Sequence, residues 1–509
     1  MRRLGTLVVV LFGSSFILYN LTAISGDPTE ALRFSTDPKA AYQLHALIRQ
    51  LQLDVPPPVR YFLWLKGILA GFVGKLDMGM TREGIAVTTR LVQAIPTTFR
   101  LVTLAALIAL VLGIILGIIT ALRQYSRFDY VVTFFSFLMF SLPIFWVAVL
   151  LKQFLAIRFN DFLANAKIAP TWIFIFSSLI AFFWAGIIGG DRKRFYTVLV
   201  VAFSSTAITI ETLNLLNWYA NPRLGIVFTS LGCIGIAYGV TAVSVGIQMK
   251  SALKSSLSLA AITTVLYFPL QWLFKAHTNF FVLSALAGLT VLTAIGLGRF
   301  FAQDDRRAVI RTAIISGLGM GLLVFIDRMM QTWGPYNLSD GVNGRPIPTI
   351  GEANPQLSST DFWITTLDRG VHLFLPTIAL TLISFAGYIR FSRGTLLDVL
   401  NQDYIRTARA KGLTERTVIV RHAVRNTMIP LTTIIVVDLA GIIGGAIITE
   451  RVFGWHGMGT LFNEAITALD LNLLMGVFFC TASLSVLANL VADLLYSALD
   501  PRIRVTGAK

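Results

Sequence analysis

Long apolar runs separated by polar connections extend along almost the whole chain. A helix that crosses the hydrocarbon core of a bilayer needs about 20 predominantly apolar residues. The pattern therefore predicts an all-α polytopic membrane protein with about twelve spans. They are expected near residues 4–24, 99–122, 130–151, 171–190, 195–216, 224–247, 257–274, 279–298, 308–326, 373–391, 428–449 and 475–499.

The first apolar run has two readings. A basic start, an apolar stretch and small residues at Ala23 and Ser25 are also the features of a signal peptide. However, the run from Leu4 to Ile24 has the length of a span, whereas the apolar region of a signal peptide has about 7–15 residues. We expect an uncleaved first span, with a signal peptide as the alternative.

Composition supports the membrane class. Hydrophobic residues make up 55% of the chain and charged residues 13%, whereas soluble domains have about 25% charged residues. The net charge of +16 would favour nucleic acid in a soluble protein. In a chain of spans, positive charge instead collects in cytoplasmic loops, so we expect membrane lipid and no nucleic acid as a partner. Cys233 and Cys480 lie in apolar runs, so no disulfide framework is expected.

The distribution of basic residues predicts the orientation of the spans. With a cytoplasmic N-terminus, every second connection is rich in Lys and Arg, as the positive-inside rule requires. The short outer connections 217–223 and 275–278 hold one basic residue each. Both termini are therefore predicted to be cytoplasmic. The predicted inner groups are Arg2/Arg3, Arg123/Arg127, Arg192–Arg194, Lys250/Lys254, Arg299/Arg306/Arg307/Arg311, the basic residues from Arg390 to Arg425, and Arg502/Arg504/Lys509.

The segment 403–430, DYIRTARAKGLTERTVIVRHAVRNTMIP, is too basic to be a span. Six basic residues at the bilayer centre would cost roughly 15–20 kcal/mol in total. The segment is expected in the cytoplasm between spans ten and eleven. Leu397, Leu400, Tyr404 and Ala408 recur at helical spacing, with Arg406 and Arg409 off that stripe.

A helix, a glycine turn and a second helix are predicted within this segment. Gly412 offers the left-handed conformation that ends a helix, and a second helix is expected to start at Thr414. Such a unit suits docking to a soluble partner, although an ordinary loop whose charges only fix topology remains the alternative. The apolar face of the second helix is expected to comprise Val420, Ala423, Val424 and Met428.

The same residues resemble the EAA loop of ABC importer permeases, in which a glycine follows Glu-Ala-Ala and precedes a spaced Ile-x-Leu-Pro. Gly412 occupies the position of the motif glycine, whereas Arg406-Thr407-Ala408 stands in place of Glu-Ala-Ala. The later positions, which are hydrophobic or proline in the motif, are His422, Val424 and Arg425 here. These departures resemble the variant of the loop in oligopeptide/dipeptide-type permeases. Four further blocks resemble that family: RYFLWLKGILAGFVGKLDMG (Arg60–Gly79), HLFLPTIALTL (His372–Leu382), ITERVFGWHGMGTL (Ile448–Leu461, with His456 where members often have Pro) and LANLVADLLYSALDPRIR (Leu487–Arg504).

The resemblance implies a six-span type I ABC importer permease core, with about six further spans inserted between its third and fourth. The expected division is a core at 1–151 with an outer segment 25–98, an inserted bundle at 152–332, a polar outer segment at 333–370, and a core at 371–509. The coupling loop is expected at 390–428. The inserted bundle contains no titratable cluster in the sequence. It is expected to be a peripheral stabilising or lipid-facing bundle, to provide a docking surface for the binding protein or an accessory subunit, with the segment Trp333–Trp363 as the contact, or to have an activity of its own.

The resemblance also implies the mechanism and the partners. Two ATPase subunits, a second related permease, an extracytoplasmic substrate-binding protein and a peptide substrate are expected, in the cytoplasmic membrane of a prokaryote. The residues expected to couple the chain to an ATPase subunit are Asp403, Tyr404, Arg406, Thr407, Ala408, Arg409, Ala410, Lys411, Gly412, Leu413, Thr414 and Glu415.

No catalytic or cofactor motif appears in the chain. The phosphate-loop pattern G-x-x-x-x-G-K-[ST] does not occur, and the five histidines have no metal-ligand spacing. The chain is therefore expected to be no enzyme and to carry no cofactor, with ATP and Mg²⁺ bound by partner subunits. A membrane enzyme, which would need a catalytic constellation, is disfavoured for the same reason.

Three residues within predicted spans carry further expectations. Asp438 is a carboxylate in the middle of a span, so we expect it either to line the pathway or to bond to another helix. Pro143 and Pro376 are expected to kink their spans.

Two alternatives to peptide import remain. One is a self-sufficient ion-coupled secondary transporter, which can also have about twelve spans. Such transporters commonly have two related halves, whereas the sequence of residues 130–330 does not resemble that of residues 370–500. An ABC permease for a non-peptide solute, such as a nickel chelate, glutathione or a sugar, is the other.

Overall fold

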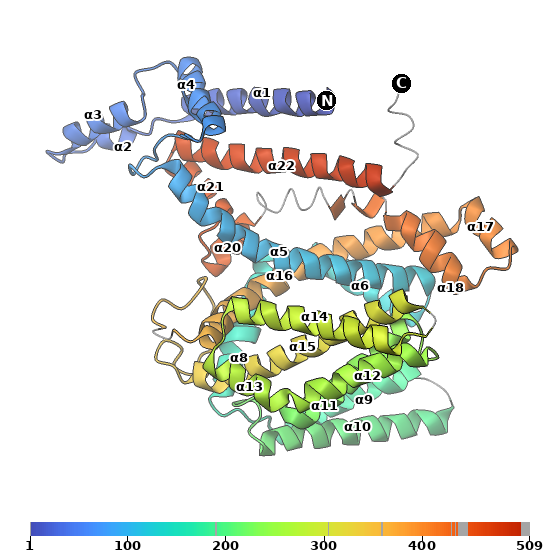
Figure 1. The fold of residues 1–509 in the computed structure, drawn as a ribbon. Helices are drawn as coiled ribbons and strands as arrows, with labels where there is room; N and C mark the ends of the chain where they lie inside the picture. The colour runs from blue at the N-terminus through green and yellow to red at the C-terminus, as the bar shows by residue number, and fades with distance from the viewer. Residues whose placement is uncertain are drawn as a thin grey trace. The chain divides into compact units, whose positions relative to one another are not determined.

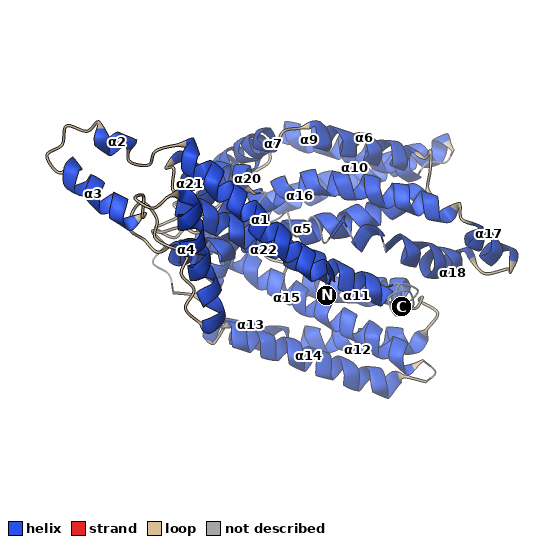
Figure 2. Cartoon of the chain, turned by 90° about the horizontal axis from the view of Figure 1, so that it is seen from above, coloured by secondary structure: helices blue, strands red, loops and turns tan. Residues whose placement is uncertain are grey.

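The computed structural model describes residues 2–188, 191–303, 305–357, 360–428, 430–432, 434–435 and 446–499. Within these ranges the regular structure is helical, and the only β-type pairing is an isolated bridge between Met80 and Ala86 (Figure 2). The chain forms two compact units. Unit 1 comprises the described residues of 1–155, 349–352 and 372 onward, and unit 2 comprises those of 156–348 and 353–371.

Unit 1 contains both ends of the described chain and the basic segment (Figure 1). The π-helix η2 (Lys152–Ile157) and the long helix α16 (Phe362–Leu400) run from one unit into the other. The remaining helices of unit 1 are α1 (Arg2–Ser25), α2 (Glu30–Arg33), α3 (Ala40–Gln50), α4 (Pro57–Leu69), η1 (Ala70–Val73), α5 (Val87–Leu122), α6 (Arg127–Ser141), α7 (Ile144–Leu151), α17 (Asp403–Ala410), α18 (Glu415–Thr417), η3 (Val418–Val424), α20 (Ile447–Phe453), α21 (Met458–Thr467) and α22 (Leu471–Leu499).

Unit 2 is a bundle of apolar helices, several of which cross most of its length. Its helices are α8 (Arg158–Leu163), α9 (Pro170–Ile188), α10 (Arg192–Leu215), α11 (Gly225–Ser244), α12 (Lys250–Val265), α13 (Tyr267–Ala276), α14 (Phe280–Phe301) and α15 (Arg306–Asn337).

The predicted spans are recovered as helices wherever the structure describes them. Eight helices of the described chain are long and apolar enough to cross a bilayer, or ten when each of two bent pairs counts as one span. Helix α9 is shorter than this criterion requires, because its apolar part covers Pro170–Gly186. The expected span at 428–449 lies largely outside the described residues. The chain is a multi-pass membrane protein.

The two prolines that were expected to kink spans behave differently. Pro143 caps the start of α7, and the chain bends by 104° between α6 and the helical stretch that begins at Ile144. Proline suits this place because it fixes its own φ angle and cannot donate a helical hydrogen bond. Pro376, in contrast, lies within α16, which continues without interruption on both sides of it.

An aromatic core joins the N-terminal helix to the end of unit 1. Helices α1 and α22 lie side by side (Figures 1 and 2), and α4 and α21 pack against them. The Tyr61 hydroxyl lies 2.8 Å from the Ser15 hydroxyl, and the Tyr61 ring packs against Tyr19 and Trp64. Two blocks that carry the family resemblance, Arg60–Gly79 and Ile448–Leu461, thus share one core with the first span.

Helices α5 and α16 meet at two glycines four residues apart. A Cβ placed on Gly113 would lie 2.4 Å from Tyr388 Cβ, and one placed on Gly117 would lie 2.6 Å from Ser392 Cβ. Only glycine permits this approach, which is the role of the G-x-x-x-G pattern between membrane helices. The contact holds the two helices that lead to the basic segment against each other.

Unit 2 contains a buried polar centre that the sequence did not predict. Asp327, on α15, is fully buried and accepts hydrogen bonds from side chains of α13 and α15 and from the start of α11. The centre holds one carboxylate among neutral hydrogen-bond donors. Its members lie far apart in the sequence and meet only in the folded chain. The donors are Tyr267 Oη (2.7 Å), Gln271 Nε2 (3.2 Å), Gln331 Nε2 (2.8 Å), Leu224 N (2.8 Å) and Gly225 N (3.1 Å).

Candidate coupling site

The basic segment forms a short helical module at the end of α16 (Figure 1). Helix α16 ends at Leu400, and α17 follows after a two-residue turn. Ile405 and Ala408 on α17 are buried, and together with Leu396 of α16 and Ala121 of α5 they form one hydrophobic cluster. This cluster, completed by Val418 and Ala423, attaches the module to the ends of two spans.

Gly412 makes the turn that ends α17. Its φ is +73°, in the left-handed region that glycine adopts without strain. Its N–H donates to Arg409 O at 3.0 Å, and the Leu413 N–H donates to Ala408 O at 3.4 Å. Thr414 then caps the second helix, since its hydroxyl accepts from Thr417 N at 3.4 Å. The glycine turn and the helix start at Thr414 are thus as the sequence predicts.

A bidentate ion pair spans this turn. Arg409 Nη2 lies 2.7 Å from Glu415 Oε1, and Arg409 Nε lies 3.2 Å from Glu415 Oε2. The hydrogen bonds to the guanidinium lower the pKa of Glu415, and the same bonds raise the pKa of Arg409. Both groups are exposed, so solvent screens the pair and its contribution to stability is small. Its effect is to hold the two sides of the turn together.

The predicted apolar stripe on the first helix is wrong at one position. Tyr404 is exposed, and Ile405 takes the buried place beside Ala408. The cause is the turn at Asn401 and Gln402, which separates α16 from α17 and shifts the phase of the pattern. The Tyr404 hydroxyl instead accepts a hydrogen bond from Asn426 Nδ2 at 2.9 Å, which ties the first helix of the module to the second.

The second helix also departs from the expected face. Residues Val418–Val424 form a π-helix, in which the hydrogen bonds run from i to i+5. The wider turn moves Val418, Ala423 and Thr427 to the buried face and leaves Val420 exposed. Of the residues expected on that face, Ala423 is buried, Val424 and Met428 are partly buried, and Val420 is not.

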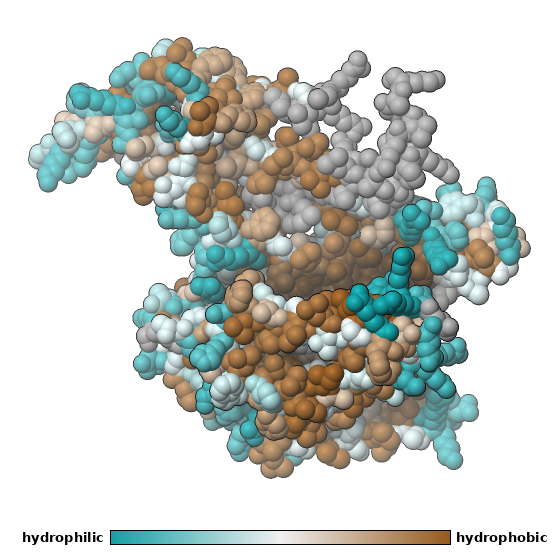
Figure 3. Space-filling view, in the orientation of Figure 1, coloured by the Kyte–Doolittle hydropathy of each residue, from teal (hydrophilic) through white to brown (hydrophobic). Residues whose placement is uncertain are grey.

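The exposed surface of the module is formed by most of the residues proposed to contact an ATPase. Hydrophilic residues gather at this end of unit 1 in Figure 3. Ala408 is the exception among the proposed residues, because it is buried in the cluster. The exposed positions are Asp403, Tyr404, Arg406, Thr407, Arg409, Ala410, Lys411, Gly412, Leu413, Thr414 and Glu415.

Two basic residues of α16 fix the base of the module. Arg393 Nη2 lies 3.0 Å from Asp129 Oδ2, at the first turn of α6, and the Asp129 side chain is buried. The Arg390 guanidinium lies 3.9 Å from the centre of the Phe140 ring, close enough for a cation–π interaction. The first contact joins α16 to the first turn of α6, and the second joins it to the C-terminal part of α6.

At the other end of α5 lies a second polar cluster, which the sequence did not predict. Glu450, on α20, is fully buried and accepts from Thr98 Oγ1 at 2.6 Å and from Thr460 N at 2.8 Å. Lys152 donates to the carbonyl of Val452 in the same turn. In the sequence, Glu450 is distinguished only by its place in the block Ile448–Leu461. Its spacing from Thr98 in the sequence carries no signal of their contact.

A short segment of the predicted outer region joins this cluster. The N–H of Gly351 donates to Phe453 O at 2.8 Å. The Glu352 carboxylate accepts from Thr97 Oγ1 at 3.1 Å and from His456 N at 3.3 Å. Residues 349–352, here called the strap, therefore belong to unit 1, although the chain on both sides of them belongs to unit 2.

The candidate pathway residue Asp438 lies outside the described residues. In the part of the chain that is described, a groove of about 490 Å³ follows α5 and includes Pro96, Arg100 and Thr103. Most of its lining residues are apolar, so in the sequence they are not distinguished from the rest of the span. In the same part, no three His, Cys, Asp or Glu residues are grouped as metal ligands would be.

A protein-family model describes binding-protein-dependent transport system inner membrane components, and it matches residues 235–505, more than half of the 509 residues. The chain belongs to this family. Family members have the type I ABC permease fold. The matched range begins inside the segment expected to be inserted, so the limits of that insertion stay a prediction.

Relatives within this permease family are peptide permeases by name. The oligopeptide transport system permease protein OppB of Mycobacterium tuberculosis is 36% identical over 225 residues, which are 44% of this chain and 67% of the relative. AppB of Bacillus subtilis, an oligopeptide permease, is 43% identical over 145 residues, 28% of this chain and 45% of the relative. The dipeptide permease DppB of Escherichia coli is 43% identical over 138 residues, which are 27% of this chain and 41% of the relative. The predicted resemblance to oligopeptide/dipeptide-type permeases is confirmed.

Proposed function

We propose that this chain is a transmembrane permease subunit of an ATP-driven importer that carries oligopeptides or dipeptides across the cytoplasmic membrane of a prokaryote. Family membership and the names of three relatives support this proposal. Both termini and the module 403–428 lie in the cytoplasm in this proposal, as the distribution of basic residues requires.

The observation that carries the proposal is the attachment of an exposed polar helix to two spans. The outer face of α17 carries Arg406, Arg409 and Lys411, and its inner face is buried against α5 and α16. A force applied to α17 would move the ends of both spans, because the cluster is closely packed and Arg393 pairs with Asp129 beside it. A loop whose charges only fix topology would need no such anchoring.

The energy comes from partner subunits in this proposal. Two ATPase subunits bind ATP and Mg²⁺, and their closure on ATP pulls the module and turns the pathway outward. Hydrolysis resets it. A second related permease completes the pathway, and an extracytoplasmic binding protein delivers the peptide. Asp438 is the proposed pathway residue from the sequence, and the groove beside Arg100 is a second candidate surface for substrate or for the partner permease.

The decisive experiment is ATPase coupling in the purified complex. Gly412→Pro forces φ to about −65° and removes the N–H that bonds to Arg409 O, so it breaks the turn. Gly246→Pro is the matched control, because Gly246 has a φ of +88°, equally open surroundings and a similar backbone bond to Thr241 O, but lies in unit 2.

We expect wild type and Gly246→Pro to co-purify with an ATPase whose activity rises with a peptide-loaded binding protein. Gly412→Pro should assemble but lose that stimulation. If the chain purifies alone and an ion gradient drives transport in all three variants, it is a secondary transporter. If the ATPase is stimulated by a binding protein loaded with a nickel chelate, glutathione or a sugar instead of a peptide, the proposed substrate class is wrong. The proposal of an ATP-driven importer would then stand.

A further inference from the structure

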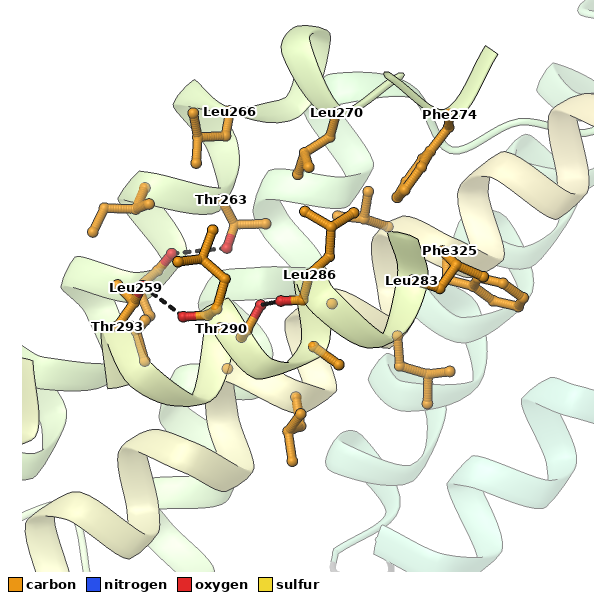
Figure 4. A pocket seen from close by; sticks show the side chains of 18 residues that line it. Leu259, Thr263, Leu266, Leu270, Phe274, Leu283, Leu286, Thr290, Thr293 and Phe325 are labelled. Carbon is orange, nitrogen blue, oxygen red and sulfur yellow. Dashed lines mark hydrogen bonds between the residues drawn. The ribbon is translucent and has the colours of Figure 1, made fainter. Parts of the chain in front are cut away.

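A cavity of about 440 Å³ lies within unit 2, bounded by α12, α13, α14 and α15 (Figure 4). Its volume falls in the range of about 300–1,000 Å³ that is usual for ligand pockets. Leucine and phenylalanine side chains provide most of its wall. The helices that form it lie in the region that the sequence predicts to be inserted, and the proposed coupling mechanism gives the cavity no role.

The polar atoms of the wall are already satisfied. The wall has three hydroxyls, and each bonds to the carbonyl four residues earlier in its own helix: Thr263 to Leu259 at 2.9 Å, Thr290 to Leu286 at 2.8 Å, and Thr293 to Leu289 at 2.8 Å. A polar ligand would lose its hydration here and gain few hydrogen bonds in return. The cavity therefore favours a hydrocarbon.

One wall of the cavity is held in place by the polar centre at Asp327. Helix α13 turns away from α12 by 54° at Leu266. Tyr267 and Gln271, on one face of α13, bond to Asp327. Leu266, Leu270 and Phe274, on another face, line the cavity, as Figure 4 shows. The buried hydrogen bonds thus fix the orientation of an otherwise short helix and keep the cavity open.

Two glycines of α15 form the opposite wall and give the cavity its width. A Cβ placed on Gly321 would meet nothing within 4 Å, whereas one placed on Gly317 would touch Thr290 and Leu259. Side chains at the edge remain exposed, with Leu289 at 59% and Leu322 at 58%. The surface of unit 2 over α12 and α14 is mostly hydrophobic (Figure 3), so the cavity continues into a face that meets the bilayer.

We propose that this cavity holds one acyl chain of a membrane phospholipid. The surrounding medium at the depth of these helices is lipid hydrocarbon, and the residues around the cavity are apolar except for three threonines whose hydroxyls are bonded within their own helices. None of the residues that line the cavity is charged. Lys250 and Lys254 on α12 and Arg299 on α14 lie near the ends of their helices, whereas Lys275 follows the lining residue Phe274 and Arg328 on α15 lies over the Trp363 ring. The bound chain packs against α13 and α15 and stabilises the bend at Leu266.

Retention of lipid by the purified full-length chain tests the proposal. Gly321→Phe fills the cavity without a backbone clash, because the space beside Gly321 is open. Gly288→Phe is the matched control, since Gly288 on α14 also has open surroundings but does not line the cavity. Native mass spectrometry in a mild detergent counts the phospholipids that remain bound. We expect one phospholipid on wild type and on Gly288→Phe, and its loss from Gly321→Phe.

A second measurement needs no change in the cavity itself. Trp363 is 2% exposed, and its ring lies 5.3 Å from those of Phe274 and Phe325, which line the cavity. In nanodiscs of phospholipid with brominated acyl chains, bromine in the cavity quenches this tryptophan. In Trp363→Phe the loss of fluorescence on quenching should be smaller than in wild type. The difference should equal the quenched emission of Trp363.

Three results would overturn the proposal. One is equal lipid retention by wild type, Gly321→Phe and Gly288→Phe. Another is quenching that does not depend on Trp363. The third is a bound apolar molecule other than a phospholipid, which would keep the cavity as a binding site but assign it a different occupant.

Discussion

Thr98 Oγ1 donates a hydrogen bond of 2.6 Å to Glu450 Oε1, although the two residues lie 352 positions apart. Both side chains are fully buried. The same threonine oxygen accepts from Met458 N at 2.8 Å, and the second carboxylate oxygen accepts from Thr460 N at 2.8 Å. The pair therefore joins α5 to the turn between α20 and α21, at the opposite end of α5 from the coupling module.

Replacing Thr98 by valine should destabilise the protein by about 1–3 kcal/mol, because it removes the donor to Glu450 Oε1 and the acceptor of the Met458 N–H, although Thr460 N still donates to Glu450 Oε2. Thermal unfolding of the nanodisc-reconstituted chain measures the loss. Glu83→Gln is the control, since its side chain is 69% exposed, and it should change stability by less than about 0.5 kcal/mol. Equal stability of Thr98→Val and wild type would show that the bond contributes little.

Gly117→Leu should separate α5 from α16. A Cβ at this position would lie 2.9 Å from Ile389 O and 2.6 Å from Ser392 Cβ, so one helix must move. Overpacking of this kind typically costs about 1–3 kcal/mol. Gly394→Leu on α16 serves as the control because nothing lies within 4 Å of its Cβ position. Cysteine pairs across the two helices, cross-linked in membranes, report the separation, and an unchanged cross-linking rate would contradict it.

Ile405→Ala should weaken coupling more than assembly. Ile405 is fully buried in the cluster that joins α17 to α5 and α16, so its truncation leaves a cavity and costs about 2–5 kcal/mol within the module. Transport per ATP hydrolysed should fall. Val420→Ala is the matched control, because Val420 is 58% exposed in the same segment. A drop of the same size in both variants would argue for direct surface contact rather than for transmission through the cluster.

The Arg409–Glu415 pair should make the glycine turn sensitive to acid. Because the bond to Arg409 lowers the pKa of Glu415 below its unfolded value of about 4.3, the pair stabilises the turn above that pH. The contribution is lost as the pH falls through the lowered pKa. Hydrogen-exchange protection of the Gly412 and Leu413 amides, corrected for intrinsic rates, should therefore decline in acid.

Glu415→Gln should abolish this acid-dependent decline, and high salt should reduce its size because the pair is exposed. Asp403→Gln is a useful comparison, since Asp403 is 96% exposed and lies at a looser 3.5 Å from Arg406. A decline that persists in Glu415→Gln would assign the pH dependence to another group.

Features that depend on neighbouring residues could be predicted from the sequence, whereas contacts between distant residues could not. The spans followed from apolar length, and the turn at Gly412 and the cap at Thr414 followed from the conformations that those residues favour. The π-helix at Val418–Val424 shifted a face that had been counted at the ordinary period of 3.6 residues.

Asp327 and Glu450 show why the remaining features could not be predicted. Asp327 collects donors from Leu224 and Tyr267, and Glu450 meets Thr98, so each site depends on how distant helices pack. A single acidic residue in an apolar run signals only that it needs partners, and does not identify them.

The strap has a consequence for any shortened form of this permease. Joining residue 155 directly to residue 372 would delete unit 2, but it would also delete Thr349–Glu352, which belong to unit 1. Thr97 Oγ1 and the His456 N–H would then lose the carboxylate that accepts their bonds. A minimal chain therefore needs a connecting peptide that returns an acidic side chain to this place, because a segment that unit 2 encloses in the sequence supplies hydrogen bonds to unit 1.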